Sequence, residues 1–125
     1  RWTEPRNVGD MINTPFQEIS PAISLDARLL YFSTNARKGK GSFDVYCAER
    51  LDDSWTKWSV PEGVGEIDTE GRELYFRPDD RGTAWYTSTK NSDGYGDVLR
   101  YEHAVAQPTI VQCNISAEVI KSGYT

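Results

Sequence analysis

The sequence predicts an all-β fold built from about two copies of one unit of antiparallel strands. Short segments rich in aromatic and β-branched residues recur through residues 1–103, separated by turn signals that contain Gly, Asn and Asp. The motif W-x-x-P-x-x-V-G occurs at residues 2–9 and again at 58–65. No stretch before residue 104 has a helical hydrophobic period.

Each unit contains three segments that we expect to form strands. The first unit, residues 1–57, has strand-like segments at 19–24, 29–34 and 43–49, and the last of these (F-D-V-Y-C-A-E) alternates with a period of two. The second unit, residues 58–103, has them at 73–77, 84–89 and 97–102. Turn signals lie between them at 25–28, 35–42, 79–82 and 91–94. Residues 104–125 break the pattern, and we expect a linker and then the possible first strand of a following β-sandwich domain.

Matching residues in the two units define the structural repeat. Asp26 matches Asp80, and Asp44 matches Asp97, in the same order along the chain. Because a catalytic group usually occurs once in a site, repeated aspartates favour a structural role such as the capping of turns. The repeat residues are Trp2, Pro5, Gly9, Asp26 and Asp44 in the first unit and Trp58, Pro61, Gly65, Asp80 and Asp97 in the second.

A unit of about 50 residues with three or four antiparallel strands is typical of a β-propeller blade. Propellers close with about 4 to 8 blades, which two units cannot supply. An open sheet edge invites pairing with another chain, so a stable protein covers it. We therefore expect either a fragment of a larger propeller or sheets whose edges are covered by something else.

Composition limits the classes of partner. Fourteen Lys and Arg against 19 Asp and Glu give a net charge of −5, which argues against nucleic-acid binding because a basic surface is the usual footprint. No apolar run approaches the roughly 20 residues that a membrane-spanning helix needs. Aromatic residues form 12% of the chain, too many for a disordered protein.

Candidates for metal binding and nucleophilic catalysis are few. Cys47 and Cys113 are far apart in the sequence and belong to no C-x-x-C motif, which disfavours zinc. Cys47 is either a buried thiol in a strand or half of a Cys47–Cys113 disulfide. His103 is the sole histidine, and no family signature surrounds a Cys47–His103 nucleophile pair. A calcium site around Asp93 and Asp97 would lack the EF-hand spacing.

The acidic pairs Asp52-Asp53 and Asp79-Asp80 admit two interpretations. A glycosidase needs two carboxyl groups about 5 to 10 Å apart, whereas adjacent aspartates in turns more often accept backbone hydrogen bonds. We favour the structural interpretation and expect no catalytic residue, no cofactor and no metal. Trp55 has no counterpart in the first unit. It is a candidate for contact with a partner, either by sugar stacking or at a protein interface.

Several phrases resemble one family in the correct order. The phrases are, in order, W-T-E-P-R-N-V-G-D-M-I-N-T, E-I-S-P-A-I-S-L-D, L-L-Y-F-S-T-N, G-K-G-S-F-D-V-Y, A-W-Y-T-S and G-Y-G-D-V. Together they resemble the WD40-like β-propeller repeats of Bacteroidetes envelope proteins of the OmpA family. The resemblance covers residues 1 to about 103. It departs at Asp26-Ala27, where the family usually has Asp-Gly. Because Ala adopts positive φ poorly, the sequence raises doubt about the geometry of this turn.

The resemblance implies a periplasmic, outer-membrane-associated accessory protein without enzymatic activity. It implies envelope protein partners, peptidoglycan bound through a neighbouring OmpA-like domain, and a link to type IX secretion or gliding machinery. The alternative is a glycan-acting propeller enzyme such as a sialidase-like hydrolase. D-D-S-W-T-K-W-S is superficially similar to the Asp-box of that class, but the spacing S-x-D-x-G-x-x-W is absent. A propeller that binds peptides, similar to TolB, is a third interpretation.

Overall fold

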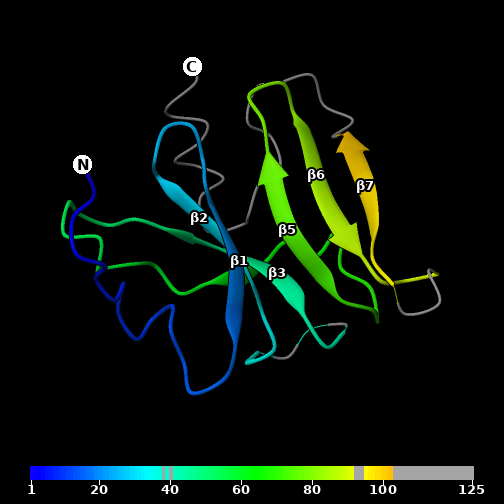
Figure 1. Ribbon diagram of the computed structural model, residues 1–125, viewed down its shortest axis with the longest axis horizontal. Coiled ribbons are helices and arrows are strands. Elements are labelled where there is room, and N and C mark those ends of the chain that lie inside the picture. Colours follow the sequence, from blue (N-terminus) through cyan, green and yellow to red (C-terminus); the bar gives the residue numbers. More distant parts are fainter. Residues whose placement is uncertain (38, 40, 92–94, 103–125) are drawn as a thin grey trace.

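A computed structural model describes residues 1–37, 39, 41–91 and 95–102. These residues contain seven β-strands and no helix, so the predicted all-β class is confirmed. The strands form two antiparallel sheets that lie side by side (Figure 1). None of the described residues belongs to a helix that could cross a membrane. The expected linker and sandwich strand at 104–125, with His103 and Cys113, lie outside the described residues.

The first sheet has four strands in the order β1-β2-β3-β4. These are β1 (Glu18–Ile23), β2 (Leu29–Thr34), β3 (Asp44–Glu49) and β4 (Glu62–Gly63). The expected strand at 29–34 has the bounds of β2, and the expected strands at 19–24 and 43–49 agree with β1 and β3 to within a single position at each end. The sequence did not predict β4, because so short a strand cannot show an alternating pattern.

The second sheet has three strands in the order β5-β6-β7. They are β5 (Glu73–Pro78), β6 (Thr83–Ser88) and β7 (Asp97–Glu102). The sheets meet at a parallel bridge between Phe43 and Arg72, where the Glu73 amide donates to the Phe43 carbonyl at 2.9 Å. Sheet 1 also includes residues 58–63, which the repeat assigns to the second unit, so the units in sequence and the sheets in space are offset.

The two sheets share the same local irregularity. The pairing of β1 with β2 is interrupted between Ile19 and Ala22, and the pairing of β5 with β6 is interrupted at the matching place, between Leu74 and Arg77. Ser20 has φ 59° and Tyr75 has φ 60°, both values that L-residues rarely adopt. A β-bulge at the same place in both sheets shows that the sequence repeat is also a structural repeat.

Each sheet has two faces, which we call front and rear. The rear face of sheet 1 carries Leu29, Tyr31, Val45 and Cys47, and it packs against Val64, Ile67, Phe76 and Ala84 of the second unit. The rings of Tyr31 and Phe76 lie 5.3 Å apart. Alternation along each strand gives the front face of sheet 1 a separate core of Ile12, Leu30, Phe32, Tyr46, Ala48 and Trp58. We call the face of sheet 2 that carries Phe76 and Ala84 its front face, and this face packs against the rear of sheet 1. The rear face of sheet 2 carries the exposed residues Trp85 and Val98.

Candidate functional site

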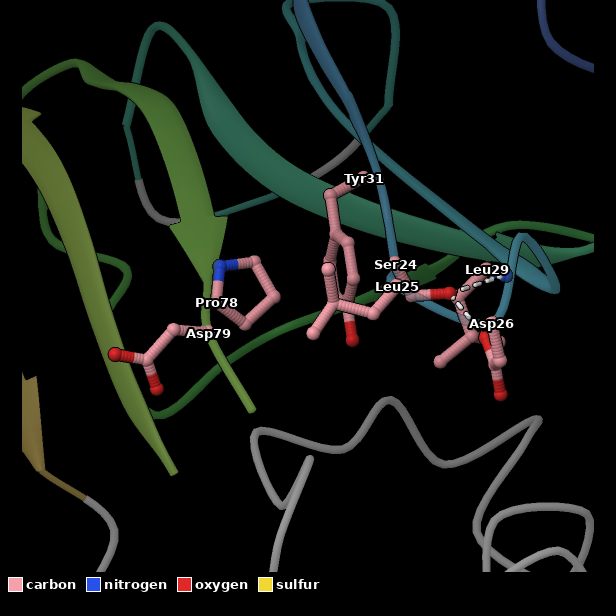
Figure 2. Close-up of a pocket in the computed structure, with 7 residues that line it drawn as sticks. All are labelled: Ser24, Leu25, Asp26, Leu29, Tyr31, Pro78 and Asp79. Carbon is pink, nitrogen blue, oxygen red and sulfur yellow. Dashed lines mark hydrogen bonds between the residues drawn. The ribbon is translucent and has the colours of Figure 1, made fainter. Parts of the chain in front are cut away.

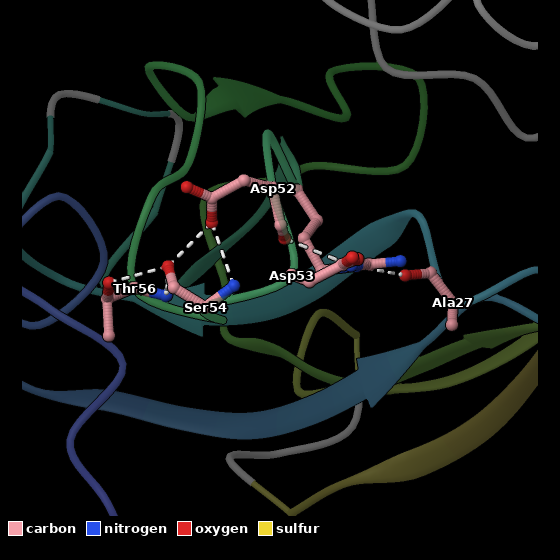
Figure 3. A network of polar contacts seen from close by, with 6 residues as sticks. Ala27, Asp52, Asp53, Ser54 and Thr56 are labelled. Atoms are coloured by element: carbon pink, nitrogen blue, oxygen red, sulfur yellow. Dashed lines mark hydrogen bonds and ion pairs between the residues drawn. The ribbon is translucent and has the colours of Figure 1, made fainter.

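The loop between β3 and β4 is organised by one aspartate. Oδ1 of Asp52 accepts hydrogen bonds from the Ser54 amide at 2.9 Å and from the Ser54 hydroxyl at 2.6 Å (Figure 3). The Thr56 amide in turn donates to Ser54 Oγ at 3.1 Å. Hydrogen bonds from the Ser54 hydroxyl and amide, with Lys57 and Arg50 nearby, hold the pKa of Asp52 below its usual value. These contacts fix the turn that carries Trp55.

Arg50 ties this loop to the turn between β1 and β2. Its Nε donates to the Ala27 carbonyl at 2.9 Å, and its Nη1 donates to the Asp52 carbonyl at 3.0 Å. The same Nη1 contacts Asp53 Oδ1 at 2.9 Å. The guanidinium carbon lies 4.4 Å from the centre of the Trp55 ring, within the range of a cation–π contact. One planar cation thus holds two loops and an aromatic ring together.

Trp55 is held at the surface in a strained conformation. Its φ is 62°, and 40% of its surface is exposed. The ring packs 6.1 Å from that of Trp58, which is only 4% exposed. Beside Trp55 lies a hollow of about 340 Å³, bounded by the loop and by the N-terminal segment. The lining residues are Arg6, Asn7, Val8, Asp53, Ser54, Trp55 and Thr56. This mixture of one aromatic ring with polar groups suits a peptide or a sugar.

Three acidic side chains meet where the two sheets join. Carboxylate oxygens of Asp44, Asp68 and Glu73 lie within 4.8 Å of one another, and Asp44 and Glu73 are buried. The Gly41 amide donates to Asp44 at 3.2 Å, and the Val45 amide donates to Asp68 at 3.1 Å. Glu73 also accepts hydrogen bonds from protein groups. Hydrogen bonds from protein groups therefore stabilise all three carboxylates. The cluster is thus explained as a structural part of the junction between the two sheets.

The glutamate of this cluster belongs to a repeated hydrogen-bond set. Glu73 accepts from the Thr69 amide at 2.8 Å, the Thr69 hydroxyl at 2.7 Å and the Ser88 hydroxyl at 2.8 Å. In sheet 1, Glu18 accepts from the Thr14 amide, the Thr14 hydroxyl and the Thr34 hydroxyl at 2.9, 2.7 and 3.0 Å. The two glutamates were not among the repeat residues predicted from the sequence, although T-x-x-x-E occurs at both 14–18 and 69–73.

Two tyrosines near the acidic cluster have altered proton affinity. Burial, followed by the charges of Asp44 and Asp68, raises the pKa of Tyr46 above its usual value. Burial, followed by the charges of Glu73 and Asp68, raises the pKa of Tyr86. Both phenols therefore stay protonated at neutral pH, and neither is suited to act as a base.

A second small hollow lies between the turns of the two units. Figure 2 shows Tyr31 pointing between Pro78 and the turn at Ser24 and Leu25, with Asp26 and Asp79 at the two sides. Its free volume is about 10 Å³, roughly the space that one water needs. Asp26 accepts from Ser24 Oγ at 2.6 Å, and Asp79 accepts from the Thr83 amide at 3.1 Å. These two carboxylates therefore close hairpin turns on either side of a space too small for a sugar.

The predicted repeat residues occupy unequal environments. Asp26 closes a turn, whereas in the second unit Asp79, not Asp80, accepts the turn amides, and Asp80 is exposed. Asp44 is buried, but Asp97 is exposed. Gly9 has φ 101° and lies against the Thr56 carbonyl, where a Cβ would be 2.8 Å away. Trp58 and Pro61 are buried, whereas Trp2, Pro5 and Gly65 are not.

The sulfur of Cys47 is oxidised. Cys47 is fully buried on the rear face of sheet 1 and is disulfide-bonded, so it is not a free nucleophile. The other members of the two pairs considered from the sequence, Cys113 and His103, lie outside the described residues.

Comparison with known proteins adds no relative. No protein-family model, no curated protein and no solved structure matches the chain.

Proposed function

We propose that the chain is a non-enzymatic, protein-binding module of β-propeller type from a bacterial cell envelope, acting as a scaffold. The single observation that carries this proposal is the Trp55 loop. A 40% exposed aromatic ring, on a residue with strained backbone, is held by Arg50 and Trp58 beside a hollow of about 340 Å³. Backbone strain in a surface loop is kept where the structure uses it, and an exposed Trp on a rigid support is a typical anchor for a partner.

The acidic residues support a binding module over a hydrolase. Four of the acidic side chains accept hydrogen bonds that shape a turn or join strands. They are Asp26, Asp52, Glu73 and Asp79. A glycosidase would need two carboxyl groups facing each other across a space wide enough for a sugar ring. The hollow between Asp26 and Asp79 holds about 10 Å³, which is far too little.

The disulfide at Cys47 supports a location in an oxidising compartment. Together with the family resemblance, it leads us to propose the periplasm, with association to the outer membrane and peptidoglycan binding by a neighbouring OmpA-like domain. Proteins of type IX secretion or gliding machinery are the envelope partners that the resemblance favours.

In-cell cross-linking tests this function. A photoreactive amino acid replaces Trp55 in the protein as expressed in its own bacterium, and the matched control carries it at Phe16, which is 65% exposed and does not line the hollow beside Trp55. We expect position 55, but not position 16, to capture a small, reproducible set of envelope proteins. Equal capture from the two positions, or none from position 55, contradicts the proposal.

An activity assay separates the alternative function. Purified protein is incubated with a panel of fluorogenic glycosides, sialosides included. We expect no turnover above that of heat-denatured protein. Turnover that disappears when Asp26 or Asp79 is replaced by Asn would establish a glycan-acting enzyme in place of a scaffold.

A further inference from the structure

The rear faces of the two sheets carry matching rows of three side chains, with one residue on each of three neighbouring strands. In sheet 1 the row is Ala22, Tyr31 and Cys47, since Tyr31 in β2 lies opposite Ala22 in β1 and opposite Cys47 in β3. All three residues are buried, with at most 9% of their surface exposed. Small and aromatic side chains of this kind suit a face that packs on an apolar surface, as the rear of sheet 1 does on Phe76 and Ala84.

In sheet 2 the same row keeps the aromatic ring but has an arginine on either side of it. Trp85 in β6 lies opposite Arg77 in β5 and opposite Arg100 in β7, three strands that lie side by side in Figure 1. We call these three residues the Arg–Trp–Arg row. Trp85 is 49% exposed, and both arginines are exposed. The row differs from that of sheet 1 in residue type as well as in exposure, and a charged side chain is almost never buried unless it is paired. The rear of sheet 2 is therefore composed for a polar or charged partner surface.

Both arginines of the row have donors to spare for carboxylates. Arg77 forms no ion pair with any residue that the structure describes. Arg100 Nη1 contacts Glu102 Oε1 at 2.8 Å, but the two side chains are 49% and 63% exposed, so water screens this pair. The contact uses one of the five N–H donors of the guanidinium. Two arginines and one glutamate leave this surface with a net positive charge, in a chain whose net charge is −5.

The spacing of the row defines the shape of the partner. Neighbouring strands lie about 4.8 Å apart, so the backbones of Arg77 and Arg100 are separated by about 10 Å, with Trp85 between them. An indole ring offers a broad apolar face, and a guanidinium binds a carboxylate through two parallel hydrogen bonds. Trp and Arg are also the residues that most often dominate the binding energy of protein interfaces. The matching ligand carries one apolar side chain with a carboxylate on either side.

We infer that the Arg–Trp–Arg row docks an acidic segment of another protein, in which two Asp or Glu side chains flank an apolar residue. A long polyanion such as nucleic acid fits less well, because the negative charge of the whole chain repels it and only two arginines oppose that repulsion. Residues 103–125 contain one Glu and no Asp, so they do not supply a pair of acidic side chains. The Trp55 loop lies between β3 and β4 of the other sheet, so the row is a second contact surface of the module.

An NMR titration with a defined peptide tests the recognition. The isotope-labelled, full-length chain is titrated with the peptide Glu-Ser-Leu-Ser-Glu, which in an extended conformation places both Glu and the Leu on one face. The control peptide is Gln-Ser-Leu-Ser-Gln, and the indole N–H signal of Trp85 is assigned with the Trp85→Phe variant. We expect the acidic peptide to shift this signal in a saturable manner and the control peptide to leave it in place. Equal shifts with the two peptides, or no shift with the acidic one, would overturn the inference.

Charge-removing variants assign the binding to the row. We expect Arg77→Gln and Arg100→Gln each to weaken binding of the acidic peptide at least about fivefold, because each removes one charge-assisted pair. Arg81→Gln is the matched control, since Arg81 is exposed in the turn between β5 and β6 and lies outside the row, and we expect a change of less than about twofold. Similar losses in all three variants would mean that only net charge matters. That result, or tighter binding of heparin than of the peptide at the same residues, would sink the inference, whatever partner Trp55 contacts.

Discussion

At the scale of single residues, two hydrogen-bonded glutamates, one buried and one half-buried, hold the repeat together. Glu73 is fully buried and accepts three hydrogen bonds from Thr69 and Ser88, across the start of β5 and the end of β6. A carboxylate suits this place because both of its oxygens accept, and one of them accepts twice. Glu18 repeats the arrangement in sheet 1, so the glutamate is an element of the unit and not of one catalytic site.

We expect Glu73→Gln to lower the free energy of unfolding by about 1–3 kcal/mol. The amide nitrogen of Gln cannot accept, so at least one buried donor loses its partner. Urea unfolding measures the difference. Glu70→Gln is the matched control, since Glu70 is exposed and contacts Lys90 at 3.5 Å, and we expect it to change stability by less than about 0.5 kcal/mol. Equal effects at the two positions would show that the buried hydrogen bonds contribute little.

Tyr101 makes stability depend on pH in the alkaline range. Its hydroxyl donates to Glu66 Oε2, and this hydrogen bond raises the pKa of Tyr101 to about 12. The unfolded chain loses this proton near pH 10 while the folded chain keeps it. The contribution is therefore complete below pH 10 and is lost as the pH rises from about 10 to about 12. We expect Tyr101→Phe to flatten the fall in stability across that window, and unfolding curves at several pH values measure it. An unchanged slope would exclude the hydrogen bond as the cause.

At the scale of elements, the two hairpin turns both contain a residue with positive φ, and the type of residue differs between them. Ala27 in the turn between β1 and β2 has φ 60°, and Gly82 in the turn between β5 and β6 has φ 82°. The sequence raised doubt about the first turn because Ala disfavours positive φ, and the structure shows that Ala27 adopts it nonetheless. The Arg50 contact to the Ala27 carbonyl and the Asp26 contact to the Arg28 amide hold that conformation.

Reciprocal substitutions test this turn strain. We expect Ala27→Gly to raise the free energy of unfolding by roughly 0.5–1 kcal/mol, because Gly reaches positive φ without a clash. Gly82→Ala should lower it by about 1 kcal/mol for the same reason. Thermal or urea unfolding measures both. A loss of stability in Ala27→Gly would mean that the gain in unfolded-state entropy outweighs the relief of strain.

The Trp55 loop depends on the planar fork of Arg50. We expect Arg50→Lys to lower the free energy of unfolding by about 1–2 kcal/mol and to shift Trp55 fluorescence towards that of a solvated ring, because a Lys ammonium cannot make the same three contacts and the stack. Arg28→Lys is the matched control. Arg28 reaches Glu49 only at 3.8 Å, and we expect a change under about 0.5 kcal/mol. Similar results for the two variants would remove Arg50 as the organiser of the loop.

At the scale of the whole molecule, the sequence predicted the repeated strands, but it missed the clusters that form only when residues distant in the sequence come into contact. Six strands followed from periodicity and turn residues, because those signals are local. Asp44 is distant in the sequence from Asp68 and Glu73, and it meets them only because the two sheets join at Phe43 and Arg72. Trp2 and Trp58 begin the same motif, yet only one is buried, because burial depends on a neighbouring strand that the motif does not encode.

Neither sheet buries its apolar faces alone, so we expect the two to unfold together. Tyr31 and Phe76 connect the rear of sheet 1 to the front of sheet 2, and Phe76 is 1% exposed. Phe76→Ala should lower stability by about 3–5 kcal/mol and speed amide hydrogen exchange in β2 and β3 as well as in β5 and β6. Phe16→Ala, at a 65% exposed position, should leave exchange in both sheets nearly unchanged. If Phe76→Ala accelerates exchange in sheet 2 only, the sheets are independent folding units, and the packing between them supplies contact without cooperativity.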